Sequence, residues 1–553
     1  MSLQKGSYEW LPHLKDSIPQ EAFGYTVSMY SVALEGWRRG LTLKFVNNNR
    51  RKSEIEYSLS YKGVEKFFCV TMGEEVQKSA VKICRDKHLT KEYLVKSGVP
   101  TPKGRFFGKG STDDELQAYA NDLGYPLVLK PAKGTGGRGV IANIKNETEF
   151  QEALSYVKGD LECEELIVEE FFAGVDYRVY VMKDRVLAVL DRISANVVGD
   201  GKRTIKELLK VKNEKRVQVP AFHKRSIKVD KEMHQVLAQS GYNLDSIPTK
   251  DERVYLKSKN NISSGGDPID ITNELPKEIK NVAIKAVEAI PGLTHGGVDI
   301  IVDSEKNTGV VLEVNSRPSI TGSLFPMQGK ARNIPKAIID HYFPETQANY
   351  DAPLYYFDFG SIYKSFLNGS AKSFTVPDVP AGPSVAARFI VIGTFSEKSY
   401  EHWIRKLAYK LNVHGYIKRI KPNKVTIIVS GSTKSIEQFR SSIYNKVQRG
   451  NSVEKIVEKD RISPVKIGFE IVIPRELEGK ITTNRSHTYL PDGYHPVHLK
   501  DPKRQKKTKR RKKTSPKVNS ERDLYKEKYE HVINSTSWKV TKPLRKLRSL
   551  FKK

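Results

Sequence analysis

The chain has 553 residues, of which 38% are hydrophobic and 29% charged, enough material for two to four globular domains. The net charge is +30, but residues 500–553 alone hold 21 Lys and Arg against five Asp and Glu, so the remainder lacks the strong positive charge of a typical nucleic-acid-binding protein. The three cysteines have no metal-ligand spacing, which argues against cysteine chemistry. The first residues contain no apolar signal core, and no window of about 18 residues is apolar, which argues against secretion and membrane spanning. These observations favour a cytoplasmic protein.

Residues 1–80 predict a small α/β cap. Residues 25–32 are apolar, residues 33–41 have a helical pattern that ends at a glycine, and residues 43–46 and 67–70 have strand patterns. These patterns assign no chemical role to any residue of the segment.

Residues 125–141 predict a phosphate-binding loop. An apolar strand ends at Lys130, a glycine-rich connection with Lys133 and Arg138 follows, and a second apolar strand begins. Glycines let backbone N–H groups approach an anion closely, and the three cations add positive charge beside them. A turn that only closes a hairpin is the alternative.

Residues 166–181 predict two strands joined by a short acidic and aromatic link. This link, residues 169–172, could offer backbone groups to the edge of a purine and an aromatic ring to its face, while a nearby carboxylate binds ribose hydroxyls. An ordinary connection between strands is the alternative.

Residues 297–315 predict a β-hairpin with one acidic face. If the turn is centred on Lys306, Asp299 lies opposite Glu313, and Asn315 falls on the same face. The other face then pairs apolar residues: Val298–Val314, Ile300–Leu312 and Val302–Val310. Facing carboxylates repel each other in a purely structural hairpin, whereas a hard divalent cation needs converging oxygen atoms, so this face predicts a magnesium site. The alternative is an acidic face that looks into solvent.

Together these segments resemble the ATP-grasp superfamily, whose members join a carboxylate to an amine through an acyl phosphate. The resemblance covers residues 80–345, with the motifs in the family's order. Residues 86–102 resemble the family's opening segment. Arg192 with residues 197–208, and later residues 260–272, resemble the branch that includes cyanophycin synthetase and bifunctional glutathione synthetase.

The resemblance implies ATP and Mg²⁺, or Mn²⁺, as cofactors and assigns residues to three groups. ATP would contact Lys87, Lys130, Lys133, Gly136, Gly137, Glu169, Glu170, Phe171, Phe172 and Asp176. The metal ligands would be Asp299, Glu313 and Asn315. The acyl phosphate and the oxyanion formed on amine attack would be steadied by Arg192, Lys202 and Arg317. Structural salt bridges are the alternative role for these last three cations.

Residues 347–383 predict a linker, and residues 384–472 predict a β-α-β-β-α-β module, the ferredoxin-like unit. The module resembles acylphosphatase. However, Glu401 stands where that family has its phosphate-binding arginine, and Arg419 stands where it has its water-positioning asparagine. Because an anionic Glu401 repels a phosphate, we expect packing or partner binding rather than hydrolysis. A tether that meets the acyl phosphate of the ligase is a further hypothesis.

Residues 473–533 predict a basic, mostly disordered linker, in which residues 503–513 contain nine cations. Residues 534–553 interleave apolar and basic side chains and predict an amphipathic helix. These two signals predict an anionic membrane surface as a partner, and the end of the chain resembles tails of bacterial surface-polysaccharide glycosyltransferases. An RNA-binding or merely solubilising tail is the alternative.

The sequence therefore predicts an α+β protein that ligates small-molecule or polymeric carboxylates and amines, such as amino acids, peptides or a cell-envelope uronic acid polymer. Its expected parts are the cap (1–80), an ATP-grasp ligase domain (81–346), the linker (347–383), the acylphosphatase-like domain (384–472), the basic linker (473–533) and the membrane-surface helix (534–553). Two alternatives stay open: a non-catalytic ATP-binding scaffold in envelope biosynthesis, and a nucleic-acid-binding protein that uses the basic tail.

Overall fold

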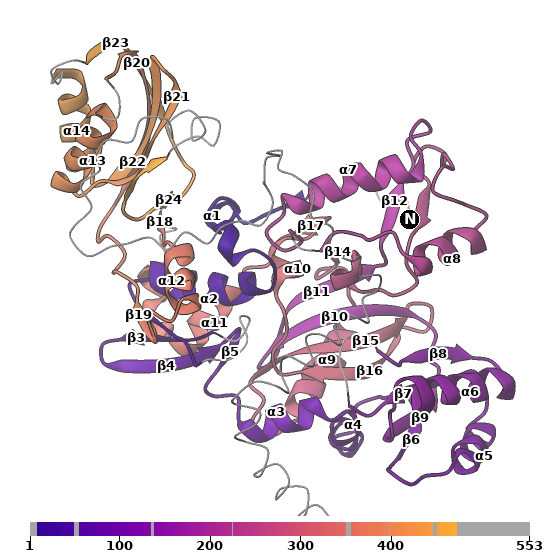
Figure 1. The fold of residues 1–553 in the computed structure, drawn as a ribbon. Coiled ribbons are helices and arrows are strands. Elements are labelled where there is room, and N and C mark those ends of the chain that lie inside the picture. The colour runs from indigo at the N-terminus through magenta and orange to yellow at the C-terminus, as the bar shows by residue number, and fades with distance from the viewer. Residues whose placement is uncertain are drawn as a thin grey trace, which may run out of the picture. The chain divides into compact units, whose positions relative to one another are not determined.

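The computed structural model describes residues 8–48, 55–133, 138–223, 225–349, 355–396, 399–445 and 451–472 (Figure 1). The predicted α+β class is confirmed, because several sheets and the helices that pack on them make up these residues. Within these ranges no helix is both long and apolar enough to cross a membrane. The predictions for the tail fall on residues 473–553, which lie outside the described part of the chain.

The first sheet of the central region is antiparallel and has the strand order β6-β9-β7-β8. Its strands are β6 (Gly104–Phe107), β7 (Leu127–Pro131), β8 (Ile141–Ile144) and β9 (Leu166–Glu170). Helices α5 (Asp113–Leu123) and α6 (Glu147–Leu154) close a core around Leu129, Phe150 and Val168. The start of α5 is fixed by a capping box in which Thr112 and Glu115 satisfy each other's backbone N–H groups.

The second sheet has the order β14-β11-β10-β15-β16 and is also antiparallel. Its strands are β10 (Val175–Met182), β11 (Arg185–Ile193), β14 (Asp267–Asp270), β15 (His295–Asp303) and β16 (Thr308–Asn315). Helix α9 (Lys277–Glu288) packs against β10, β15 and β16 (Figure 1). Val179, Val298 and Ile300 share a buried core with this helix. Since side chains alternate along a strand, Asp299 and Arg178 fall on the opposite face.

The hairpin of β15 and β16 has part of its predicted register. Two predicted pairs are present: Asp299–Glu313 and Val298–Val314. Two others are wrong: Ile300–Leu312 and Val302–Val310. The observed partners are Val311 for Ile300 and Gly309 for Val302. The cause is a β-bulge at Leu312, which is an extra residue on β16. Because residues 310–312 are all apolar, the buried face of the hairpin stays apolar after the pairing shifts by one residue.

The N-terminal segment forms helix α2 (Val27–Arg38) and the sheet order β19-β2-β3-β4-β5. The strands are β2 (Thr42–Val46), β3 (Glu56–Tyr61), β4 (Val64–Cys69), β5 (Met72–Gly73) and β19 (Ser373–Thr375). Helix α2 ends at Arg38, and the following Gly40 adopts a φ of +85°, a backbone conformation that glycine tolerates best. The predicted helix and strands of this segment are thus present with shifted ends.

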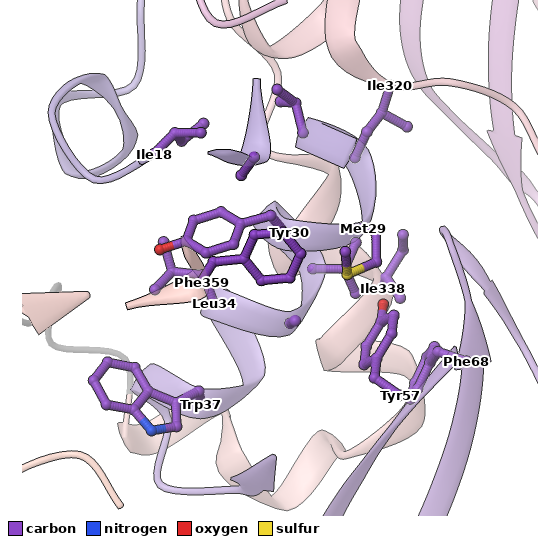
Figure 2. Packing of buried hydrophobic residues seen from close by; sticks show 14 of the residues in the cluster. Ile18, Met29, Tyr30, Leu34, Trp37, Tyr57, Phe68, Ile320, Ile338 and Phe359 are labelled. Atoms are coloured by element: carbon purple, nitrogen blue, oxygen red, sulfur yellow. The ribbon is translucent and has the colours of Figure 1, made fainter. Parts of the chain in front are cut away.

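The segment predicted as a linker is folded at residues 355–376. It contains β18 (Tyr355–Tyr356), α12 (Phe359–Leu367) and β19, which pairs with β2. Tyr30 of α2 lies with its ring centroid 4.9 Å from Phe357 and 5.8 Å from Phe359. Figure 2 shows Tyr30 beside Phe359, with Leu34 and Trp37 further along the same helix. Burial of these aromatic rings is the reason that the segment does not behave as a linker.

Two further groups of elements complete this part of the chain. One cluster is built around Ile205, Leu237 and Val254. It comprises β12 (Asn196–Val198), α7 (Ile205–Val217), α8 (Lys231–Gln239) and β13 (Arg253–Tyr255). After β16 come α10 (Thr321–Leu324) and α11 (Ile334–Tyr342), and α11 packs on α2.

Residues 385–472 form the predicted β-α-β-β-α-β unit. The elements are β20 (Val385–Thr394), α13 (Ser399–Lys410), β21 (His414–Lys421), β22 (Lys424–Gly431), α14 (Thr433–Asn445), β23 (Ser452–Asp460) and β25 (Phe469–Val472). The sheet order is β23-β20-β22-β21-β25, and β25 adds a strand parallel to β21. Helices α13 and α14 cover one face of the sheet (Figure 1) and bury Phe389, Ile404 and Phe439 in a core of their own.

Candidate active site

A cavity of about 460 Å³ is lined by residues from both central sheets and is called the central cavity here. It gathers most of the predicted site residues: Lys87, Lys130, Glu169, Glu170, Phe171, Phe172, Asp176, Arg192, Asp299 and Glu313. The rest of its lining combines apolar side chains, among them Val128, Ile301 and Leu312, with polar and charged ones. A cavity in which charged groups converge beside apolar and aromatic side chains can bind a small charged molecule.

Two lysines, Lys87 and Lys130, line the central cavity, and a third, Lys91, shares the partner of Lys130. Lys87 is the first residue of α4 (Lys87–Lys96), and Lys130 lies near the end of β7. Glu169, which is 2% exposed, forms ion pairs with Lys130 and, at 3.0 Å, with Lys91. Burial lowers the pKa of Lys87 and of Lys91, while Glu313 and Glu169 respectively oppose that shift. Glu169 thus acts first as a counter-charge that lets lysines be buried here.

The acidic and aromatic link after β9 is held by backbone bonds. The backbone N–H of Lys103 donates to Glu170 Oε1 at 2.7 Å, and the N–H of Phe171 donates to the Pro126 carbonyl at 3.0 Å. Both Phe171 and Phe172 line the central cavity. The link therefore offers the cavity a fixed backbone and two aromatic rings.

A row of alternating charges crosses the second sheet. Arg178 on β10 lies opposite Asp299 on β15, and its Nη2 donates to Asp299 Oδ2 at 2.8 Å. Arg192 on β11 binds both carboxylate oxygens of Asp176, at 2.5 and 2.6 Å, and its Nη1 lies 3.4 Å from Asp299 Oδ1. Glu313 on β16 lies opposite Asp299 on the other side. Five charged side chains from four neighbouring strands thus face one cavity.

These contacts shift the proton affinities of the row. Burial raises the pKa of Asp176, and Arg192 offsets only part of that rise. Burial alone would lower the pKa of Arg192, but the charges of Asp299 and Asp176 outweigh it and raise that pKa. Arg192 therefore stays cationic at any physiological pH.

Of the three predicted metal ligands, Asp299 and Glu313 line the central cavity, whereas Asn315 is not part of its lining. Asp299 and Glu313 face each other across the ladder, and Glu313 forms no ion pair within the described ranges. Asn315 has a buried side-chain amide nitrogen with no hydrogen-bond partner there. Among the described residues no group of three or more His, Cys, Asp or Glu side chains could hold a metal, so a cation at this place would need the amide of Asn315 besides the two carboxylates.

Several predicted residues are not brought to the central cavity. Lys202 is exposed and is absent from its lining, and Lys133 pairs at 2.6 Å with Glu165 at the surface. Arg317 lines a second cavity instead. Gly136 and Gly137 lie outside the described residues.

The structure adds cavity residues that the sequence prediction missed. Arg178 is one, and a signal for it existed, because it follows Asp176 by two positions on the same strand and so shares its face. Lys259 and Asn260 also line the cavity, from the segment whose motif resembled the family. Leu312 had no signal, since the bulge that turns it toward the cavity is invisible in an apolar run.

The acylphosphatase-like module has an ion pair where that family binds phosphate. Arg419 donates from Nε and Nη2 to the two carboxylate oxygens of Glu401, at 2.6 and 2.9 Å. Glu401 is 5% exposed. The two charges neutralise each other within the protein. Arg419 is therefore not available to an anionic substrate unless its buried ion pair with Glu401 is broken.

Comparison with known proteins agrees with this geometry. Residues 84–323 match the family model of the ATP-grasp domain, and residues 387–471 match that of acylphosphatase. Cyanophycin synthetase of Trichormus variabilis is 33% identical over 302 residues, which are 53% of this chain and 32% of that protein. The glutathione biosynthesis bifunctional protein GshAB of Desulfotalea psychrophila is 30% identical over 262 residues, or 46% of this chain and 33% of that protein.

A solved structure is also similar, the bifunctional glutathione synthetase from Pasteurella multocida. It shares 28% identity, with a TM-score of 0.44, over 55% of this chain and 41% of that one. The chain spans about a third of the length of the curated relatives just named. The chain therefore contains an ATP-grasp domain, homologous to those of cyanophycin synthetase and GshAB, followed by an acylphosphatase-like domain.

Proposed function

We propose that this protein is an ATP-dependent carboxylate–amine ligase that forms an amide bond through an acyl phosphate. The observation that carries the proposal is the central cavity, which is lined by Lys87 and Lys130 and by the facing carboxylates Asp299 and Glu313. Phosphoryl transfer needs chiefly positioning and positive charge, and both are available in this arrangement.

In the proposed mechanism the lysines bind the phosphates of ATP, and Phe171 and Phe172 with the apolar lining enclose the adenine. The substrate carboxylate attacks the γ-phosphorus, ADP leaves, and the amine then attacks the acyl carbon with release of phosphate. Asp299, Glu313 and Asn315 would hold Mg²⁺ or Mn²⁺. When bound, the cation supplies Lewis-acid charge neutralisation at the transferred phosphate.

We infer that Arg192 and Arg178 exchange partners when the site fills. Both arginines now contact Asp299, at 3.4 and 2.8 Å. A cation bound by Asp299 would neutralise the negative charge of its carboxylate. The two guanidinium groups could then turn to the acyl phosphate and to the oxyanion that forms on amine attack. Lys202 has no part in this proposal because its side chain is exposed.

The two alternative functions are less well supported. A non-catalytic scaffold has no need for a carboxylate such as Glu313, which lines the central cavity and forms no ion pair within the described ranges. A nucleic-acid-binding protein has no need for the central cavity. We further propose that the substrates are amino acids, peptides or a cell-envelope polymer, that the protein works in the cytoplasm, and that its basic tail binds an anionic membrane surface.

The proposal is tested by a screen of carboxylates against amines. Purified protein is supplied with ATP and Mg²⁺, and ADP and phosphate are measured for each pair. We expect release that needs both a carboxylate and an amine, and that stops when EDTA is added. ATP bound with no stimulated release by any pair would favour the scaffold.

A further inference from the structure

A second cavity, of about 850 Å³, lies against the N-terminal sheet and helix α3 (Lys78–Arg85), and we call it the basic cavity. Its cations are Lys78, Lys82 and Arg85 from α3, together with Arg317. Its apolar lining includes Phe67, Phe68, Met72 and Val81. None of the residues that line it also lines the central cavity.

The four cations of the basic cavity are not neutralised by the protein. None of them forms an ion pair or side-chain hydrogen bond within the described part of the chain, and Arg317 Nε is buried without a partner. Two acidic residues, Glu56 and Glu74, also line the cavity. Glu74 is already bound by Lys66 at 3.0 Å and by the Phe67 N–H at 3.1 Å. The cavity therefore presents an excess of positive charge to whatever enters it.

The cations form a row that leads toward the central cavity. Positions 78, 82 and 85 follow the spacing of one helix face, so successive charges rise by about 6 and 4.5 Å along α3. Arg317 follows Glu313 by four residues, so their Cα atoms are at most about 14 Å apart. Helix α3 also packs against β16, which carries Glu313. An extended molecule bound in the basic cavity would therefore have to span only about this distance to place one end near Glu313.

We propose that the basic cavity binds the non-reacting carboxylates of an oligocarboxylate substrate, one further carboxyl of which extends past Arg317 to be phosphorylated. A single small amino acid has too few charges to occupy the row. The apolar lining accommodates the backbone between successive carboxylates. This inference rests on the proposed ligase function, and it specifies the class of the acyl substrate.

The experiment measures binding of triglutamate to the full-length chain by calorimetry, without ATP, and compares it with neutral triglutamine. The test variant combines Lys78→Gln, Lys82→Gln and Arg85→Gln. The control is Lys277→Gln, an exposed lysine on α9 that lines neither cavity. We expect triglutamate alone to bind, and the triple variant to lower its affinity about tenfold or more, with a further loss on adding salt.

Trigalacturonate forms a second arm, which shows whether the row prefers a peptide or a saccharide backbone. Equal affinity of wild type and triple variant, or no binding of either trimer, overturns the proposal. The thermal unfolding midpoint of the triple variant should equal that of the control, because the three side chains are exposed. If the trimers bind but ADP is released under no condition, the basic cavity is a carboxylate site and the proposed ligase function is contradicted. If ADP is released with monocarboxylates only, the ligase function is supported and the proposed role of the basic cavity is contradicted.

Discussion

Asp299 is contacted by Arg178 and Arg192 and lies opposite Glu313, so its charge balance decides whether the central cavity binds a cation. The row holds two arginines and three carboxylates, the third being Asp176, so its charges nearly cancel. Addition of a divalent cation and the phosphates of ATP keeps that balance, because each new charge has an opposite partner nearby. We therefore expect the cavity to bind a metal nucleotide more tightly than either component alone.

Glu313→Gln removes the one carboxylate of this row that has no ion pair within the described ranges. We expect turnover to fall by at least about two orders of magnitude, because charge neutralisation at the transferred phosphate weakens. The matched control is Glu305→Gln, at an exposed position in the turn between β15 and β16. Steady-state ADP release and the thermal unfolding midpoint measure both effects. Near-normal turnover in Glu313→Gln would contradict the assignment of Glu313 to the active site.

His295 gives the protein a stability that depends on pH. It is fully buried, Tyr180 Oη lies 2.9 Å from its Nδ1, and burial lowers its pKa to about 4. The unfolded chain therefore binds a proton between about pH 6.5 and 4 that the folded chain does not, so acidification favours unfolding.

We expect His295 to remove about 3 kcal/mol of unfolding free energy as pH falls from 7 to 4. His295→Phe removes this titration. Urea unfolding at several pH values measures the slope, which should be shallower in the variant across this window. Parallel slopes for wild type and variant would show that His295 is not the group involved.

At the scale of elements, the sequence was sufficient wherever one periodicity governed a segment. The strands at residues 127–131 and 166–170 are short apolar runs that end at charged residues, and the module at residues 385–472 has a regular succession of strand and helix patterns, so their types could be predicted. The bulge at Leu312 could not, because three apolar residues in a row satisfy the core in either register. The sequence placed Asp299 opposite Glu313 but could not show that arginines from two other strands contact Asp299.

The acylphosphatase-like module should fold but not hydrolyse an acyl phosphate above background. Its core is formed by its own residues, and Glu401 is engaged by Arg419 through two hydrogen bonds. Residues 384–472, expressed alone, are assayed with a small acyl phosphate, and circular dichroism confirms folding. Brisk hydrolysis would mean that the anion site lies elsewhere in the module.

At the scale of the whole molecule, one core joins segments that are far apart in the sequence. Tyr30, Trp37 and Phe45 pack with Phe357 and Phe359 in the same buried cluster. The nearby run of Pro, Gly and Ser made residues 347–383 look like a linker, and composition alone gave no sign that α12 completes the N-terminal core. Arg317 was likewise assigned to catalysis from its neighbours in the sequence, although it lines a different cavity.

The tail is expected to set the location of the protein. Each Lys or Arg near an anionic leaflet contributes about 1 kcal/mol, and apolar burial adds to it. Neutralising five cations at residues 503–513 should weaken cosedimentation with anionic vesicles in a salt-dependent way, whereas Trp538→Ala with Leu547→Ala should weaken it even at low salt. Protein that stays in the supernatant at low salt contradicts membrane binding, and affinity for RNA that falls steeply with salt would favour nucleic acid.

The most direct test of the ligase account uses hydroxylamine in place of the amine. An acyl phosphate reacts with it to give a hydroxamate, so the identity of the second substrate is not needed. With ATP, Mg²⁺ and an accepted carboxylate, we expect hydroxamate and ADP in equal amounts, and neither from Glu313→Gln above about one hundredth of the wild-type rate. Release of AMP and pyrophosphate, or ATP hydrolysis that no carboxylate changes, would contradict the account.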